Sequence, residues 1–122
     1  MKPGKTGLAR IIDAAGYSFK GLRFAWKNEA AFRQESVLAL VLIPLAFWIG
    51  NNAVQISLLI GSCLIVMIVE LLNTGIEAVV DRISDEYHTL AGSAKDLGSA
   101  AVLISLLQVL VVWVLVIMER FF

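Results

Sequence analysis

The sequence predicts an all-α membrane protein, in which one amphipathic helix lies at the membrane interface and three further helices cross the membrane. Hydrophobic residues make up 59% of the 122 residues, against roughly 45–50% in soluble globular proteins. Three apolar segments can span a bilayer as helices, the first of them only together with its N-terminal flank, and the basic residues gather on one side of them. A chain of this length makes one domain, so residues 1–122 are expected to fold as a single unit.

Residues 7–28 are expected to form the interfacial helix. Bulky apolar residues such as Leu8 and Phe19 recur at intervals of three and four and line one helix face, whereas basic residues such as Arg10 and Lys20 lie mostly on the other. A helix with one apolar and one basic face suits the plane of the membrane interface. The alternative is an ordinary amphipathic helix packed against a protein core.

The first membrane span is expected at about residues 30–49. Its continuously apolar part, residues 37–49, would be only about 20 Å long as a helix, which is less than the roughly 30 Å of a hydrocarbon core. The helix therefore has to include residues back to Ala30. The stretch Gly-Asn-Asn at 50–52 ends it, because glycine and asparagine tolerate turn conformations, and so short a turn returns the next helix antiparallel.

The second and third spans follow at about residues 54–84 and 96–119. The second would form roughly 45 Å of helix, so its C-terminal end should protrude from the bilayer core into water. The third is the least ambiguous span, because its interior has only three polar residues, Ser99, Ser105 and Gln108.

The placement of basic residues predicts the orientation. Ten basic residues balance ten acidic ones, so no net charge indicates a nucleic acid or an acidic partner. By the positive-inside rule, the N-terminus and the loop between the second and third spans are cytoplasmic, and the C-terminus lies across the membrane. Nine of the ten basic residues lie before or at the start of the first span or around that loop, namely Lys2, Lys5, Arg10, Lys20, Arg23, Lys27, Arg33, Arg82 and Lys95.

An acidic stripe interrupts the second span. At 100° per residue, Glu70, Asn73, Glu77 and Asp81 lie along one helix face over about 16 Å. Ionisable groups at such depth are costly, so they normally face protein or trapped water and mark a functional path. The alternative, an exposed helix end that reaches into water, is strongest for Asp81.

Three spans leave little room to enclose such a stripe, so a homo-oligomer that hides it between chains is expected. Small side chains at the start of the third span would allow close helix approach at that seam. They are Gly98, Ser99, Ala100 and Ala101.

Two classes of function could use the stripe. An ion transporter would need polar groups across the whole membrane, but residues 54–69 contain nothing ionisable, so the stripe stops partway. A site confined to one half of the membrane suits chemistry between a lipid and a polar substrate from the cytosol. A small oligomeric transporter remains the alternative.

Further polar residues indicate phosphate chemistry. Glu29 lies at a depth similar to that of Glu77, and the two could share a hard divalent cation. Lys95 and Asp96 come at the start of the third span, where an amine and free backbone N–H groups attract phosphate oxygens, although Lys95 could equally be a positive-inside anchor. His88 is either a surface residue or a ligand. No Walker A pattern is present, so a nucleotide site would differ from those of soluble P-loop kinases.

Three segments carry a family resemblance: EAAFRQE (29–35), IVELLNTGIEAVVDR (68–82) and AKDLGSAAVL (94–103). Together they closely resemble the prokaryotic diacylglycerol kinase family, and the likeness covers nearly the whole chain. The spacing of the acidic stripe, followed by Lys-Asp some fourteen residues later, is quite specific. Gly75 stands where the family often has alanine, so looser local packing is expected there without loss of chemistry.

The resemblance implies an ATP- and Mg²⁺-dependent lipid kinase of the bacterial inner membrane, a homotrimer with composite active sites that makes phosphatidic acid from diacylglycerol. It implies that Glu70 accepts the proton of the lipid hydroxyl, that Glu29 and Glu77 hold Mg²⁺, and that Asn73 and Asp81 support them. The implied ATP-binding residues are Arg10, Tyr17, Glu29, Glu77, Glu86, Tyr87, His88, Lys95 and Asp96. The implied lipid-binding residues are Arg10, Glu70, Ser99 and Trp113. An undecaprenol kinase of the same fold remains open, because relatives phosphorylate undecaprenol.

Overall fold

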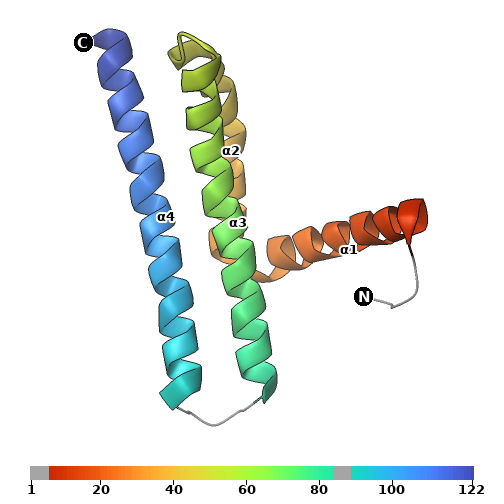
Figure 1. Ribbon diagram of the computed structural model, residues 1–122. Coiled ribbons are helices and arrows are strands. Elements are labelled where there is room, and N and C mark those ends of the chain that lie inside the picture. The colour runs from red at the N-terminus through yellow and green to blue at the C-terminus, as the bar shows by residue number, and fades with distance from the viewer. Residues whose placement is uncertain (1–5, 84–88) are drawn as a thin grey trace.

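The computed structural model describes residues 6–83 and 89–122, and these residues form four helices. They are α1 (Gly7–Asn28), α2 (Ala30–Ile49), α3 (Ala53–Ile83) and α4 (Thr89–Phe121). The last three are long and apolar enough to cross a membrane. They stand side by side, whereas α1 leaves this bundle at a steep angle (Figure 1). The prediction of an all-α fold with three candidate membrane spans is therefore confirmed.

The joint between α1 and α2 consists of one residue, Glu29. Its backbone is extended, with φ −121° and ψ 107°, so the two helices cannot continue into each other. The Glu29 N–H donates to the carbonyl of Ala25 at 2.9 Å. The Arg33 guanidinium donates to the carbonyls of Trp26 at 2.7 Å and Lys27 at 3.2 Å, which satisfies the last carbonyls of α1. These bonds hold Glu29 at the corner of the fold.

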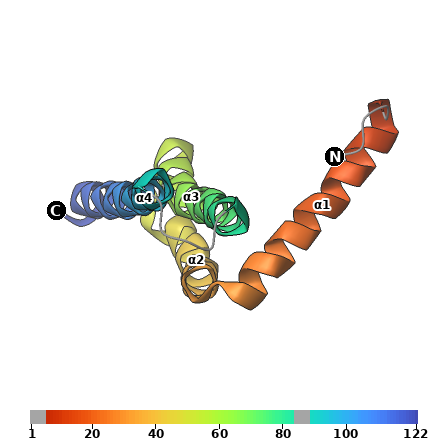
Figure 2. The ribbon, with the colours of Figure 1, turned by 90° about the horizontal axis from the view of Figure 1, so that it is seen from below.

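Helix α3 packs against both α2 and α4, which touch each other only slightly (Figure 2). On α2 the buried side chains include Phe32, Ala39 and Ala46, one every seventh residue. On α4 the buried Gly98 and Ser105 are also seven residues apart. This period keeps one face of each helix against α3 along its length, and the small residues allow close approach.

Leu59 lies at the centre of the core, where its side chain is fully buried. The buried indole of Trp113 donates from Nε1 to the Leu59 carbonyl at 3.2 Å. Nearby, the Gln108 amide donates from Nε2 to the Ser62 carbonyl at 2.8 Å. Polar side chains of α4 thus bond to the backbone of α3, which satisfies them away from water.

The turn between α2 and α3 is closed by Gln55. The side-chain oxygen of Gln55 accepts a hydrogen bond from the backbone N–H of Asn51 at 2.8 Å. The backbone N–H of Gln55 donates to Oδ1 of Asn52 at 2.9 Å. Its amide Nε2 donates to Glu119 Oε1 at 2.6 Å, so the end of α4 is tied to the same turn. The predicted short turn and antiparallel return are confirmed.

Helix α4 begins at Thr89, earlier than the predicted span start at residue 96. The apolar run marks only the part of the helix that suits lipid, and the helix continues past it. Lys95 is the seventh residue of α4, so its backbone N–H lies inside the helix and not at its N-terminus. The expectation that free N–H groups at this point attract phosphate is therefore wrong, and the Lys95 amine is the group that remains.

Two glycines inside helices have opposite surroundings. A Cβ at Gly98 would overlap the side-chain amide of Asn73 on α3, whereas a Cβ at Gly75 would meet nothing within 4 Å. Gly75 lines a cavity of about 500 Å³ between α1 and α3, together with Gly21, Ala25 and Thr74. The looser packing expected at Gly75 agrees with this. Gly98 therefore packs against α3 of its own chain. The other three small residues of the predicted contact between chains, Ser99, Ala100 and Ala101, are exposed.

We predict that Gly98→Ala destabilises the bundle by about 1–3 kcal/mol, because the added methyl overpacks the α3–α4 contact. The matched variant Gly75→Ala places the same methyl in open space and should be neutral or stabilising by up to roughly 1 kcal/mol, since alanine is the better helix former. Unfolding of purified protein in mixed detergent micelles, followed by circular dichroism, measures both. Equal stabilities for the two variants would contradict the close approach at Gly98.

Candidate active site

The acidic stripe of α3 runs from a buried to an exposed position. Glu70 is 7% exposed, Asn73 and Glu77 are half-buried, and Asp81 is exposed. The predicted common face is therefore present, and its two ends see different surroundings. Such a gradient joins an apolar interior to water along a single helix face.

Glu70 is enclosed by its own chain. It is 7% exposed within a single chain, and Glu35 on α2 acts electrostatically on it. The burial of Glu70 therefore needs no second chain. The homo-oligomer stays a prediction, and enclosure supports it only for the exposed end of the stripe.

Glu35 is the residue that sequence reasoning missed. The sequence analysis assigned no role to it. The signal that could have found it is its register: Glu35 lies three residues after Phe32 and four before Ala39, on the face that buries both. An acidic residue in that register points into the bundle.

Asn73 orients Glu77. Its Nδ2 donates to Glu77 Oε1 at 3.2 Å, one helical turn along α3. The Asn73 Oδ1 atom is buried against Gly98 and accepts no hydrogen bond from the described residues. The close approach of α4 therefore fixes the amide, and the amide in turn holds one oxygen of Glu77.

At the exposed end of the stripe, Asp81 forms an ion pair with Lys95 of α4 at 2.7 Å. Both side chains remain substantially exposed, so solvent screens the pair and it contributes little to stability. Lys95 also acts electrostatically on Glu77. Its amine can therefore meet an anionic ligand at little cost.

Two carboxylates, those of Glu29 and Glu77, were predicted to hold a cation. Glu29, at the corner between α1 and α2, and Glu77 both act electrostatically on Glu70. Among the described residues there is no group of three or more side chains of the usual metal-binding types. Mg²⁺ in phosphate-transfer sites is commonly bound by one or two carboxylates and completed by phosphate oxygens and water. Glu29 and Glu77 fit that mode by the chemistry of their donors.

Other predicted residues lie away from the stripe of their own chain. Arg10 and Tyr17 are exposed on the part of α1 that projects from the bundle (Figure 2). Trp113 is buried beside Leu59, about 16 Å along α3 from Glu70 at 1.5 Å per residue. Ser99 is exposed on α4 next to Gly98, and Asp96 is exposed beside Lys95. Glu86, Tyr87 and His88 lie outside the described residues.

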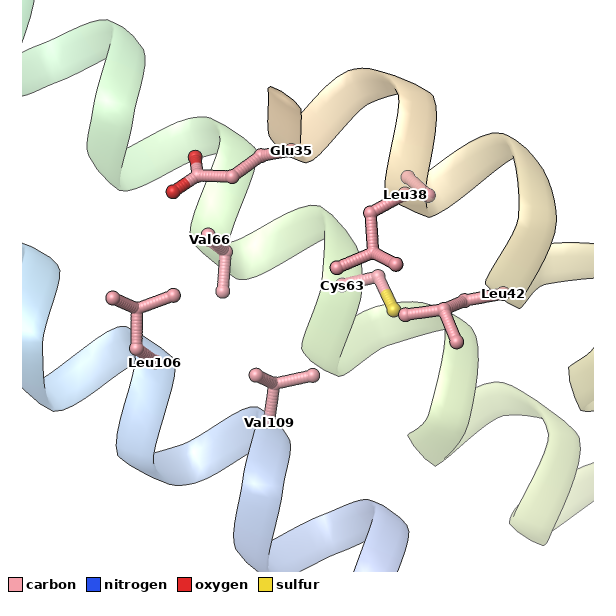
Figure 3. A pocket seen from close by; sticks show the side chains of 8 residues that line it. Glu35, Leu38, Leu42, Cys63, Val66, Leu106 and Val109 are labelled. Atoms are coloured by element: carbon pink, nitrogen blue, oxygen red, sulfur yellow. The ribbon is translucent and has the colours of Figure 1, made fainter. Parts of the chain in front are cut away.

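A small cavity adjoins the buried end of the stripe. It has a volume of about 60 Å³, and its wall is formed by apolar side chains of α2, α3 and α4 together with Glu35. Figure 3 shows Glu35 reaching from α2 across α3, with Leu38, Leu42 and Val109 further along the cavity. The carboxyl thus stands at the boundary between an apolar space and the acidic stripe.

Comparison with known proteins identifies the family. The family model described as prokaryotic diacylglycerol kinase matches residues 16–117. The diacylglycerol kinase of Escherichia coli K12 is 54% identical over 121 residues, which cover 99% of each chain. The diacylglycerol kinases of Haemophilus influenzae and Pseudomonas aeruginosa are 53% and 50% identical, over 88% and 90% of this chain and 92% and 89% of their own.

The match to the Escherichia coli protein covers 99% of this chain, so all four helices fall within it. The chain belongs to the prokaryotic diacylglycerol kinase family.

Proposed function

We propose that this chain is a lipid kinase that transfers the γ-phosphoryl group of ATP to the hydroxyl of diacylglycerol and so makes phosphatidic acid. The family membership supports the reaction. The observation that carries the proposal is the acidic stripe, which is buried at Glu70 and exposed at Asp81. A lipid hydroxyl can approach it from the apolar side and a cytosolic triphosphate from the aqueous side.

Glu70 is the proposed base. It is the most buried acidic group of the stripe, so it lies where a lipid hydroxyl would be located. In phosphoryl transfer the protein contributes mainly positioning and neutralisation of phosphate charge. Glu70 would accept the hydroxyl proton as the oxygen attacks phosphorus.

The nucleotide is proposed to bind at the outer half of the stripe. Glu29 and Glu77 would hold Mg²⁺, which when bound neutralises phosphate charge. Asn73 keeps Glu77 oriented through its amide. The Lys95 amine, now paired with exposed Asp81, would turn to the phosphates. Asp96, Glu86, Tyr87 and His88 remain proposed ATP contacts.

The assembly is proposed to be a homotrimer with shared active sites. Only Ala25 of α1 is buried, and the helix leads away from the stripe of its own chain. Arg10 and Tyr17 could therefore contact nucleotide or lipid at the stripe of a neighbouring chain. The exposed apolar face of α1, including Leu8 at 72% and Phe19 at 74%, favours a position in the membrane interface.

We propose the inner membrane as the location, with the N-terminus and the active site on the cytoplasmic side. The distribution of basic residues supports this orientation. Ser99 and Trp113 remain proposed contacts of the lipid.

Glu70→Gln should lower turnover by about 10²–10⁴-fold, because the amide cannot accept the hydroxyl proton. Transfer of label from γ-labelled ATP to diacylglycerol in mixed micelles measures it. Glu119→Gln, which changes an acidic residue at the other end of the bundle, is the control and should keep full turnover. An active Glu70→Gln protein with wild-type assembly would remove Glu70 from the base role.

Glu77→Ala should raise the Mg²⁺ concentration required for half-maximal activity, since one of two metal carboxylates is lost. Titration of Mg²⁺ at fixed ATP, in wild type and variant, measures this. A lowered maximum with an unchanged Mg²⁺ requirement would mean that Glu77 acts on structure alone.

Diacylglycerol should be phosphorylated faster than undecaprenol in the same micelles, as the names of the relatives indicate. Faster labelling of undecaprenol would reassign the substrate. The transporter alternative is tested separately in liposomes, where cation flux without ATP consumption would overturn the kinase proposal.

A further inference from the structure

Gly98 is where the backbone of α4 meets the acidic stripe. It is buried on the face of α4 that packs against α3. A Cβ at this position would overlap Oδ1 of Asn73 and would lie 3.1 Å from its Cγ and 3.9 Å from its Cβ. Because the three nearest atoms all belong to Asn73, the absence of a side chain at Gly98 serves the fit of this one amide.

The Asn73 amide is held in one of its two orientations. Its Nδ2 donates to Glu77 Oε1 at 3.2 Å, and an ionised carboxylate only accepts hydrogen bonds, so the nitrogen has to face Glu77. Its Oδ1 then faces Gly98, where it is buried and where no donor in the part of the chain that the structure describes reaches it. One polar and one steric contact thus fix the same amide from opposite sides.

This orientation has a cost and provides one hydrogen bond. A buried carbonyl oxygen without a donor is unfavourable, and a small apolar side chain at the position of Asn73 would avoid that cost. What the amide provides instead is an N–H directed at Glu77, one turn further along α3. Glu77 is the carboxylate that is proposed to bind Mg²⁺ together with Glu29, so its orientation bears on the chemistry.

We propose that Gly98 is a positioning residue for Glu77. Because Gly98 has no side chain, the Asn73 oxygen fits against α4, and the amide N–H then holds one carboxylate oxygen of Glu77 in place. This inference rests on the proposed role of Glu77 in binding Mg²⁺. Removal of a group that orients a metal-binding side chain typically weakens metal affinity by about 10–100-fold. Gly98 exerts such an effect indirectly, through Asn73.

Helix α4 contacts the stripe a second time, three residues earlier, where Lys95 pairs with Asp81 at 2.7 Å. Glu77 lies between Asn73 and Asp81 on α3, so α4 touches the stripe on both sides of it. A methyl at Gly98 could therefore act in two ways: it could displace the amide alone, or it could push α4 away and disturb Lys95 as well. The proposal requires the first way, and the experiment has to separate the two.

Gly98→Ala tests the role directly. The added methyl displaces the Asn73 oxygen, so the Mg²⁺ concentration for half-maximal turnover should rise about tenfold, with kcat at saturating Mg²⁺ nearly unchanged. Binding of Mn²⁺ in the presence of a non-hydrolysable ATP analogue, followed through the EPR signal of the free ion, should weaken by the same factor without any turnover. Gly75→Ala adds the same methyl in open space and should match wild type in both measurements.

Asn73→Ala separates the amide from the position of α4. It removes the bond to Glu77, so it should raise the Mg²⁺ requirement about as much as Gly98→Ala does. In the double variant the methyl at position 98 enters the space that the amide has left. Its unfolding midpoint should therefore be higher than that of Gly98→Ala alone, while its Mg²⁺ requirement stays at the value of Asn73→Ala.

A folded Gly98→Ala protein with the Mg²⁺ requirement and the Mn²⁺ affinity of wild type overturns the proposal. A double variant in which the two losses add also overturns it, because Gly98 would then act by moving α4. The comparison of the double variant with Asn73→Ala decides the same point if Gly98→Ala alone does not fold. An unchanged Mg²⁺ requirement in Glu77→Ala refutes the proposed metal site and this inference with it, whereas a shift in Glu77→Ala with none in Gly98→Ala refutes only the positioning role.

Discussion

The packing of α3 against α2 and α4 is the constraint on which the rest of the molecule depends, because the helix face that builds the core also carries the acidic residues. Leu59, Ser62 and Val66 lie on this buried face, and Glu70 and Thr74 continue it in the same register. The character of the face changes from apolar to ionisable without any change in the direction of the side chains. The helix is continuous from Ala53 to Ile83. The packing that fixes its apolar half therefore also fixes the position of the acidic residues in its other half.

The corner at Glu29 brings a third element to this face. A single extended residue turns the chain from α1 into α2, and Arg33 bonds back to the end of α1. The backbone of Glu29 is therefore held by its own geometry and by the bonds that Arg33 makes to the end of α1, and the proposed role in binding metal would require such rigidity. The helix beyond the corner has little contact with its own bundle, and its apolar residues face outward. One chain thus brings Glu29 and the acidic stripe of α3 to the same region, while most of α1 is left free to contact the membrane or a neighbouring chain.

Much of the fold could be predicted from the sequence, because apolar runs and helical periodicity are local properties. The number and order of helices, the turn at residues 50–52 and the common face of the stripe all follow from them. The start of α4 did not, since an apolar run marks the part of a helix that suits lipid and not its full length. Gly98 shows a further limit: a small residue predicts close approach, but not whether the neighbour is a helix of the same chain.

Glu35 was missed for a related reason. Its half-buried position depends on the rotation of α2 about its axis. That rotation is set by Phe32, Ala39 and Ala46, which the structure buries, and the sequence alone did not show that this face of α2 turns inward. The roles of Arg10 and Tyr17 depend on neighbouring chains, and no local pattern carries that information.

The two ends of the α3–α4 pair are fastened very differently. At one end Gln55 closes the turn and holds Glu119 through part-buried hydrogen bonds, while at the other an exposed ion pair joins Asp81 to Lys95. The described contact at Asp81 is therefore the one that added salt screens, because both of its side chains are exposed, whereas the hydrogen bond at Gln55 is part-buried.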